Sequence, residues 1–177
     1  MNLSNCKNIK RVLVTGGAGF IGSHIVDAYI KAGLEVVIVD NFSQGNKKNI
    51  NKKAKVYKAD ICDLQSLKKI MKTEQPQLIN HHAAHVDVRR SQKNPIFDAN
   101  QNIIGLLSML QATENTSLKK IIFASSGGAI YGEQPIPTHE RSLTTPTSPY
   151  GVSKRAGELY IQSYSRYFNI PYVSLRY

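Results

Sequence analysis

The sequence predicts an α/β fold built around a doubly wound parallel sheet. Short apolar segments alternate with longer segments of helical periodicity along the 177 residues. The segments expected as strands are 11–15, 35–40, 55–58, 77–80, 120–124 and 172–176. Helices are expected near 21–32, 66–73, 96–115 and 150–168. Because alternating strands and helices form right-handed crossovers, the helices should cover both faces of the sheet.

The first expected strand runs directly into a glycine-rich turn. Gly16, Gly19 and Gly22 fit the pattern G-x-x-G-x-x-G, and Gly17 with the last two also fits G-x-G-x-x-G. Such glycines allow a tight turn, close approach of the backbone to a phosphate and close packing of helix on strand. The amides at the start of the next helix would face the anion. This layout predicts a site for a dinucleotide pyrophosphate, although glycine turns without a ligand also exist.

The second expected strand ends in an acidic residue. Asp40 lies about 20 residues beyond the glycines, the spacing of a carboxylate that binds the adenosine ribose. This carboxylate would repel a 2′-phosphate, and no arginine stands beside it. The sequence therefore predicts a Rossmann-type domain that binds NAD rather than NADP.

Length and composition are typical of a single globular domain, with 41% hydrophobic residues. No apolar run is long enough to span a membrane, and the polar start lacks a signal-peptide core. Only Cys6 and Cys62 are present, which suits a reducing compartment better than a disulfide scaffold. We therefore expect a cytoplasmic protein that has no membrane partner.

The formal net charge is +11, and many lysines lie between Lys47 and Lys58. A basic surface of this kind could bind nucleic acid. The lysines are scattered over several segments, however, and lack interleaved aromatic residues. We expect a solvated surface without a nucleic-acid partner, whose positive field helps to attract an anionic nucleotide.

Tyr150 and Lys154 are one helical turn apart, so that both side chains lie on the same face. A phenol with a pKa near 10 is a poor base at neutral pH. An adjacent ammonium and the positive nicotinamide of oxidised NAD would both favour the phenolate. The pair thus predicts a tyrosine general base, with the lysine also binding the nicotinamide ribose.

With these motifs in order, the chain resembles the extended short-chain dehydrogenases/reductases, in particular the NAD-dependent epimerases and dehydratases of nucleotide sugars. The resemblance covers essentially the whole chain and includes residues 15–22, 40–41, 60–61, 82–84, 100, 125–132, 150–154 and 175–177. It implies that Tyr150 and Lys154 also contact the cofactor. The other cofactor-binding residues that it implies are Gly16, Gly19, Phe20, Ile21, Gly22, Asp40, Asn41, Asp60, Ile61, Ala83, Ala84, His85 and Asn100, the last through its backbone.

Within that family, the segment 123–132 looks most like that of UDP-glucose 4-epimerases. In such enzymes a tyrosine takes the sugar hydroxyl proton while hydride passes to the nicotinamide and later returns to the opposite face. Dehydratases carry an Asp-Glu pair where this chain has Gly128 and Ala129, so dehydration is disfavoured. A sugar 4-reductase or a C4-decarboxylase is the alternative enzyme.

One family position departs from the expected residue. A catalytic serine or threonine usually stands four residues before the tyrosine equivalent to Tyr131, and Gly127 occupies that place here. Ser125 and Ser126 precede it, and either hydroxyl could bond the sugar oxygen. We favour Ser126, while a polar strand end without a catalytic role remains the alternative for both.

His81, His82 and His85 suggest a metal site at first sight. No acidic or cysteine ligand lies at a suitable spacing, and no helical face holds these histidines together. Their match to the cofactor-contacting segment explains them better, so no metal is expected.

Two further expectations concern the whole protein. The helices near 96–115 and 150–168 carry apolar residues around most of their circumference, which suggests a second packing partner. That partner is either a missing part of the protein or a second subunit, and we expect a homodimer. In the family, a substrate domain of comparable length follows the NAD-binding domain, whereas residues 1–177 contain only the latter. We therefore expect a truncated epimerase for UDP-hexoses or, alternatively, an NAD-binding module with little turnover.

Overall fold

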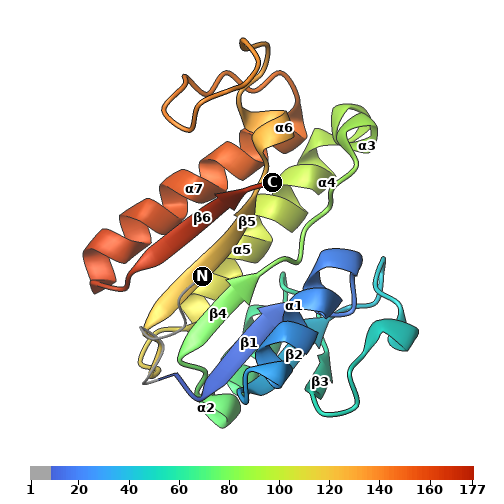
Figure 1. Ribbon diagram of the computed structural model, residues 1–177, viewed down its shortest axis with the longest axis vertical. Helices are drawn as coiled ribbons and strands as arrows, with labels where there is room; N and C mark the ends of the chain where they lie inside the picture. The colour runs from blue at the N-terminus through green and yellow to red at the C-terminus, as the bar shows by residue number, and fades with distance from the viewer. Residues whose placement is uncertain (1–8) are drawn as a thin grey trace.

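The computed structural model describes residues 9–177, so Cys6 lies outside the described part of the chain. The described strands form one parallel sheet in the order β3-β2-β1-β4-β5-β6 (Figure 1). The strands are β1 (Arg11–Thr15), β2 (Glu35–Asp40), β3 (Lys55–Lys58), β4 (Leu78–His81), β5 (Lys120–Ser125) and β6 (Tyr172–Arg176). The predicted doubly wound α/β fold is confirmed.

The helices between the strands are close to those expected, with one exception. They are α1 (Phe20–Lys31), α2 (Leu64–Glu74), α3 (Val88–Lys93), α4 (Pro95–Ala99), α5 (Gly105–Ala112), α6 (Gly127–Ile130) and α7 (Pro149–Phe168), with a 3-10 turn η2 (Lys47–Asn49) and a π-helical turn η3 (Asn100–Ile104). No helix in residues 9–177 is long and apolar enough to cross a membrane.

The helix expected at 96–115 is present as a continuous helical run from Pro95 to Ala112, but a π-helical turn interrupts its register and it ends three residues earlier than expected. Asn94 caps α4 by accepting a hydrogen bond from the Phe97 amide, and Pro95 occupies the first turn, where its missing N–H costs nothing. The π-helical turn then changes the helical register before α5 begins. The short helices α3 and α6 were not predicted, and β4 begins and ends one residue later than expected.

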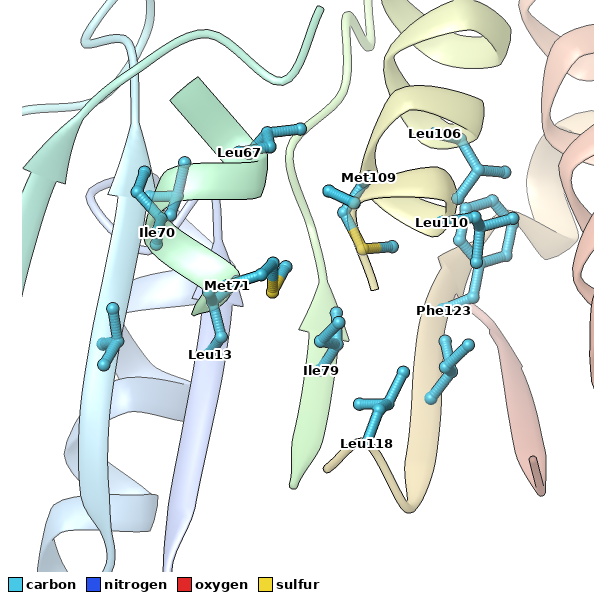
Figure 2. Close-up of a cluster of buried hydrophobic side chains, with 14 of the residues drawn as sticks. Leu13, Leu67, Ile70, Met71, Ile79, Leu106, Met109, Leu110, Leu118 and Phe123 are labelled. Carbon is cyan, nitrogen blue, oxygen red and sulfur yellow. The ribbon is translucent and has the colours of Figure 1, made fainter. Parts of the chain in front are cut away.

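Each face of the sheet buries its own apolar cluster. On one face, α2, α5 and α7 pack over the strands, as Figure 2 shows for Met71, Met109 and Phe123. On the other face, Val26 of α1 packs on Val12, Val14, Val36, Ile38 and Leu78. The connections from β1 and β4, which are neighbours, therefore leave on opposite faces. In open α/β sheets, ligands bind at such a switch point, beyond the carboxyl ends of the strands.

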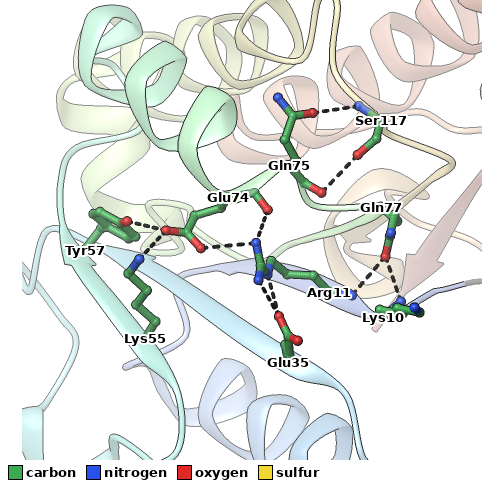
Figure 3. A network of polar contacts seen from close by, with 9 residues as sticks. All are labelled: Lys10, Arg11, Glu35, Lys55, Tyr57, Glu74, Gln75, Gln77 and Ser117. Atoms are coloured by element: carbon green, nitrogen blue, oxygen red, sulfur yellow. Dashed lines mark hydrogen bonds and ion pairs between the residues drawn. The ribbon is translucent and has the colours of Figure 1, made fainter.

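A network of hydrogen bonds and ion pairs lies at the opposite end of the sheet, where β1, β2 and β3 begin (Figure 3). The buried Glu74 carboxylate at the end of α2 accepts hydrogen bonds from Tyr57 and, at 2.6 Å, from Lys55 Nζ. Arg11 donates to the Glu74 carbonyl oxygen at 2.6 Å and also pairs with Glu35. Burial disfavours the charge of Glu74, but these contacts outweigh it and lower the pKa of this carboxyl. The network thus fastens α2 to three strands, away from the switch point.

Candidate functional site

The glycine turn lies against the end of β4. Gly16 has φ of +69°, and a Cβ added there would lie 2.7 Å from the Ala83 amide nitrogen. A Cβ on Gly22 would lie only 2.1 Å from the carbonyl oxygen of Gly16, to which the Gly19 amide donates at 3.0 Å. Only glycine fits at positions 16 and 22. The absence of a side chain lets the backbone of the turn pack closely against the residue after β4 and against the first turn of α1, as in the glycine pattern typical of pyrophosphate sites.

The N-terminus of α1 leaves its first amides available. Gly19 is the N-cap residue, and it provides no side-chain hydrogen bond to them. The amides of a first helical turn have no acceptor within the helix. Phe20 and Ile21 are exposed here, with 79% and 44% of their surfaces accessible. These donors, together with the positive end of the helix dipole, fit an anionic group.

The carboxylate of Asp40 is buried against this turn. Its Oδ2 accepts a hydrogen bond from the Ala18 amide at 3.0 Å, and its Oδ1 accepts one from the Phe42 amide at 2.8 Å. A Cβ on Gly45 would lie 2.8 Å from Oδ1. Each oxygen retains acceptor capacity beyond these bonds, because an ionised carboxylate has about four acceptor sites. The ribose-binding prediction for Asp40 is compatible with this placement.

Asn41, Asp60 and Ile61 lie beside Asp40, past the ends of β2 and β3. Asn41 Nδ2 donates to Asp60 Oδ2 at 2.9 Å, and the Cys62 amide donates to Oδ1 at 2.8 Å. Partial burial disfavours the charged form of Asp60, but these hydrogen bonds lower its pKa overall. Ile61 is buried, and a Cβ on Gly105 would meet it at 2.6 Å. Asn41 is therefore engaged in orienting Asp60.

Thr15, the last residue of β1, joins the two strands at the switch point. Its Oγ1 accepts hydrogen bonds from the amides of His82 and Ala83, at 3.2 and 3.1 Å, and pairs with Nδ1 of His81 at 2.9 Å. The predicted cofactor residue Ala84 follows directly, with an intermediate exposure. Sequence reasoning did not single out Thr15, because its partners lie more than 60 residues away.

A buried asparagine organises the loop after β4, and it is Asn102 rather than Asn100. Asn102 Nδ2 donates to the His85 carbonyl oxygen at 2.9 Å, while Oδ1 accepts from the His85 amide at 2.8 Å. Asn100 is exposed at the start of the π-helical turn, and its carbonyl oxygen accepts from Cys62 Sγ at 3.4 Å. The π-helical register turns Asn102 inward, which no local sequence pattern indicates.

Tyr150 and Lys154 lie together in the first turns of α7, whose N-terminus is capped by Ser148. Both side chains are buried, and Lys154 Nζ lies 5.9 Å from the centre of the Tyr150 ring. Burial lowers the pKa of Lys154 to about 8, against the opposing charge of Asp98. Burial raises the pKa of Tyr150, and a hydrogen bond with Ser126 counteracts this rise. The arrangement holds an ammonium and a phenol in one buried site.

The two candidate serines have different partners. Ser125 is buried, and its Oγ donates to Oε1 of Glu158 at 2.7 Å. Glu158 also forms ion pairs with Arg155 and Arg176, each at 2.8 Å. Ser126 is only partly buried and interacts with Tyr150. The Ser125 hydroxyl thus belongs to an ion-pair cluster, whereas the Ser126 hydroxyl lies at the phenol.

The three histidines lie in different surroundings. Burial and the charge of Lys154 lower the pKa of His81 to about 3 and that of His82 to about 4. His82 Nε2 pairs with the Tyr177 hydroxyl at 3.1 Å, and the His85 ring contacts Phe97 edge-on. Within residues 9–177, no three histidine, cysteine or acidic side chains are grouped to hold a metal ion.

The glycine turn after β1 and the tyrosine–lysine pair on α7 define a Rossmann domain of the extended short-chain dehydrogenase/reductase class. Residues 12–177 match the family model of the NAD dependent epimerase/dehydratase family. The chain belongs to this family.

Relatives and solved structures agree with this assignment. A Methanocaldococcus jannaschii protein is 46% identical over 167 residues, and the UDP-glucose 4-epimerase of Mycolicibacterium smegmatis is 38% identical over 166 residues. These alignments cover 94% and 90% of this chain but only 54% and 53% of the relatives. The chain therefore spans about half the length of the curated relatives that it matches.

Among solved structures, the UDP-glucose 4-epimerase of Thermotoga maritima with UDP-glucose has a TM-score of 0.92 and 42% identity. The enzyme of Thermus thermophilus in complex with NAD has a TM-score of 0.91 and 40% identity. Each alignment covers 94% of this chain, and 55% and 54% of the respective solved chains. The family is NAD dependent, and this chain corresponds to the N-terminal part of its epimerases.

Proposed function

We propose that this chain is the NAD-binding, base-carrying half of a cytoplasmic NAD-dependent nucleotide-sugar 4-epimerase that acts on UDP-glucose and UDP-galactose. The observation that carries this proposal is that Tyr150 and Lys154 of α7 lie together with Ser126, which follows β5, in a domain whose β1 ends in the glycine turn. The similarity to UDP-glucose 4-epimerases over about half of their length supports the substrate class.

The residues around the switch point fit NAD. Backbone amides at Phe20 and Ile21 would hold the pyrophosphate, in a cradle that a Cβ on Gly22 would fill. Asp40 would accept hydrogen bonds from the adenosine ribose hydroxyls. Asp60 and Ile61 would border the adenine, with Asn41 holding the Asp60 carboxylate. Oxidised NAD, when bound, accepts a hydride from sugar C4 and returns it, so that it is regenerated in each cycle.

Each catalytic side chain then has a separate task. Tyr150 takes the proton of the C4 hydroxyl and later gives it back. Lys154 favours the phenolate through its positive charge and holds the nicotinamide ribose. Ser126 donates to the phenol or to the sugar oxygen. Burial raises the pKa of Tyr150 in the ligand-free protein, so the nearby positive charges have to overcome desolvation before it acts as a base.

The test separates the epimerase from the alternative, an NAD-binding module with little turnover. NAD binding to the chain is measured by calorimetry, and interconversion of UDP-glucose and UDP-galactose by chromatography of the products. We expect binding to the chain, and interconversion that Tyr150→Phe reduces by about 10²- to 10⁴-fold, the contribution of a positioned acid–base group. Binding without interconversion, in the chain and in any longer product of its gene, would favour the module.

We also propose that α5 and α7 pair with a second copy of the chain. Ile104, at the end of η3, and Val152, Leu159, Tyr160 and Tyr167 on α7 are exposed, and a groove of about 380 Å³ runs between α5 and α7. Light scattering after size-exclusion chromatography should give a dimer mass that Tyr167→Glu lowers to that of a monomer. A monomer at every concentration would contradict this proposal.

A further inference from the structure

A fully buried carboxylate lies next to the catalytic turn of α7. Asp98, on α4, has no accessible surface. Its Oδ2 accepts a hydrogen bond of 2.6 Å from Ser153 Oγ, and its Oδ1 accepts one of 2.9 Å from Asn102 Nδ2. Ser153 immediately precedes Lys154, and Asn102 holds the backbone of His85. This one side chain therefore connects α7, the π-helical turn and the loop after β4.

The charge environment of Asp98 is unusual for a buried carboxylate. Its two hydrogen-bond donors, Ser153 and Asn102, are neutral. His85 Nδ1 lies 3.7 Å from Oδ1, too far for a hydrogen bond, and has no other hydrogen-bond partner. A buried charge without a cation in direct contact is costly, which suggests that Asp98 serves something other than stability.

The titratable and charged groups around this region come from three elements. Tyr150 and Lys154 on α7 interact electrostatically with Asp98. His81 and His82, at the end of β4, interact with Lys154. His85 precedes α3, and on α3 itself Arg90 stacks on Phe97. Among these groups, Asp98 has the only carboxyl group.

We propose that Asp98 is a positioning residue of the Tyr150–Lys154 pair. Its hydrogen bond to Ser153 fixes the catalytic turn of α7 against α4, and its buried charge keeps Lys154 in the ammonium form. This inference rests on the proposed function, in which Lys154 must be charged in order to favour the phenolate.

The physical reason is the desolvation of Lys154. Burial favours the neutral amine and brings its pKa down to about 8, and the Asp98 charge is the contribution that opposes this fall. Without that charge the amine would lose its proton nearer to neutral pH. A neutral amine stabilises no phenolate. The same charge raises the pKa of Tyr150, so the phenol oxygen keeps its proton in the ligand-free protein.

Asp98→Asn tests the charge with little change of shape. The oxygen of the new side-chain amide would still accept from Asn102, and its NH₂ group would donate to the Ser153 hydroxyl, which also accepts hydrogen bonds. The titration midpoint of Lys154 is followed by NMR of carbon-13 lysine, with Lys154→Arg used to identify the signal. We expect a lower midpoint than in the unmodified chain. An unchanged midpoint in folded Asp98→Asn would overturn the inference.

Ser153→Ala is the matched control, because it removes one hydrogen bond of Asp98 and leaves the charge. We expect its Lys154 midpoint to shift less than that of Asp98→Asn; an equal or larger shift would contradict a role of the charge. Should Asp98→Asn fail to fold, carbon-13 carboxyl NMR of the unmodified chain decides the matter. An ionised Asp98 at neutral pH supports the inference, and a protonated one overturns it.

These titrations require neither NAD nor a sugar, so the two proposals can fail separately. An unchanged Lys154 midpoint in a chain that binds NAD contradicts only the role of Asp98. A lowered midpoint in a chain that does not bind NAD contradicts only the proposed function.

Discussion

Lys154 Nζ donates a hydrogen bond of 2.8 Å to the main-chain carbonyl oxygen of Ala124. This bond joins the buried face of α7 to β5 just before the candidate serines. It also places the ammonium 5.0 Å from the centre of the Phe123 ring. The lysine is thus held by one carbonyl oxygen and lies near two aromatic rings, those of Phe123 and Tyr150.

The buried ammonium makes stability depend on pH. The pKa of Lys154 is about 8 in the folded protein, against an ordinary value of 10.5, so between these values the unfolded chain binds the extra proton. Stability therefore rises with pH across this window, as the cost of burying the charge disappears. In Lys154→Met this rise should be absent. Urea denaturation at several pH values measures it, and parallel curves for the two proteins would contradict the prediction.

Exchanging each serine for alanine should have different effects. Ser125→Ala removes a buried hydrogen bond to the charged Glu158. We expect it to lower the free energy of unfolding, measured by urea denaturation, by about 1.5–3 kcal/mol. Ser126→Ala should lower the free energy of unfolding by a smaller amount, because this residue is only partly buried. Since its hydrogen bond favours the phenolate, Ser126→Ala should raise the pKa of Tyr150 further, as seen by carbon-13 tyrosine NMR. Equal losses of stability would show that the hydroxyls share one structural role.

Glu158→Gln should weaken the protein at neutral pH more than in acid. Burial opposes the charge of Glu158, but contacts with Arg176, Ser125 and Arg155 lower the pKa of this carboxyl overall. Its contribution is therefore present above the ordinary value of 4.5 and is lost as the pH falls through the lower folded pKa. We expect Glu158→Gln to lower the free energy of unfolding by about 1.5–3 kcal/mol at neutral pH, the range for hydrogen bonds to charged groups.

The control for this prediction is Glu133→Gln, at an exposed position. Thermal denaturation of both variants at neutral and acidic pH should show a difference from the unmodified chain only for Glu158→Gln. A loss that stays constant as the pH falls would mean that the carboxylate charge is not what stabilises the cluster.

Gly22→Ala should impair both folding and NAD binding. Its Cβ would lie 2.1 Å from the Gly16 carbonyl oxygen, so the turn has to open, at a cost of roughly 1–3 kcal/mol as in other overpacked sites. Gly128→Ala is the matched control, since no heavy atom lies within 4 Å of its added Cβ. Calorimetry should show weaker NAD binding for Gly22→Ala and unchanged binding for Gly128→Ala. Normal affinity in Gly22→Ala would remove the turn from the proposed site.

Local patterns predicted most of the sheet, and they failed where distant contacts set a boundary. The strand β4 extends to His81 because its ring is buried, stacked on Phe123 and bonded to Thr15. Gln77 was expected in this strand but lies just before it. Its side-chain oxygen accepts hydrogen bonds from the backbone amides of Lys10 and Arg11. Periodicity alone contains no information about such partners.

The helix expected at 96–115 differs from the observed one for another reason. Its apolar residues have a helical spacing throughout, so the sequence favoured one helix. The helix starts after the cap at Asn94 and continues to Ala112, but the π-helical turn changes its register, so that Asn102 is buried while Asn100 stays exposed. The predicted backbone role of Asn100 in cofactor binding stays a prediction.

By itself, the sequence determined the parallel α/β fold, the glycine turn and the shared face of Tyr150 and Lys154, because each depends on residues close together in the chain. Only the tertiary structure showed that Ser125 bonds to Glu158 while Ser126 lies at Tyr150, and that Asp98 accepts a hydrogen bond from Ser153. The first and last of these contacts join residues 33 and 55 positions apart. They form because burial leaves each polar group only the few partners that packing brings within reach.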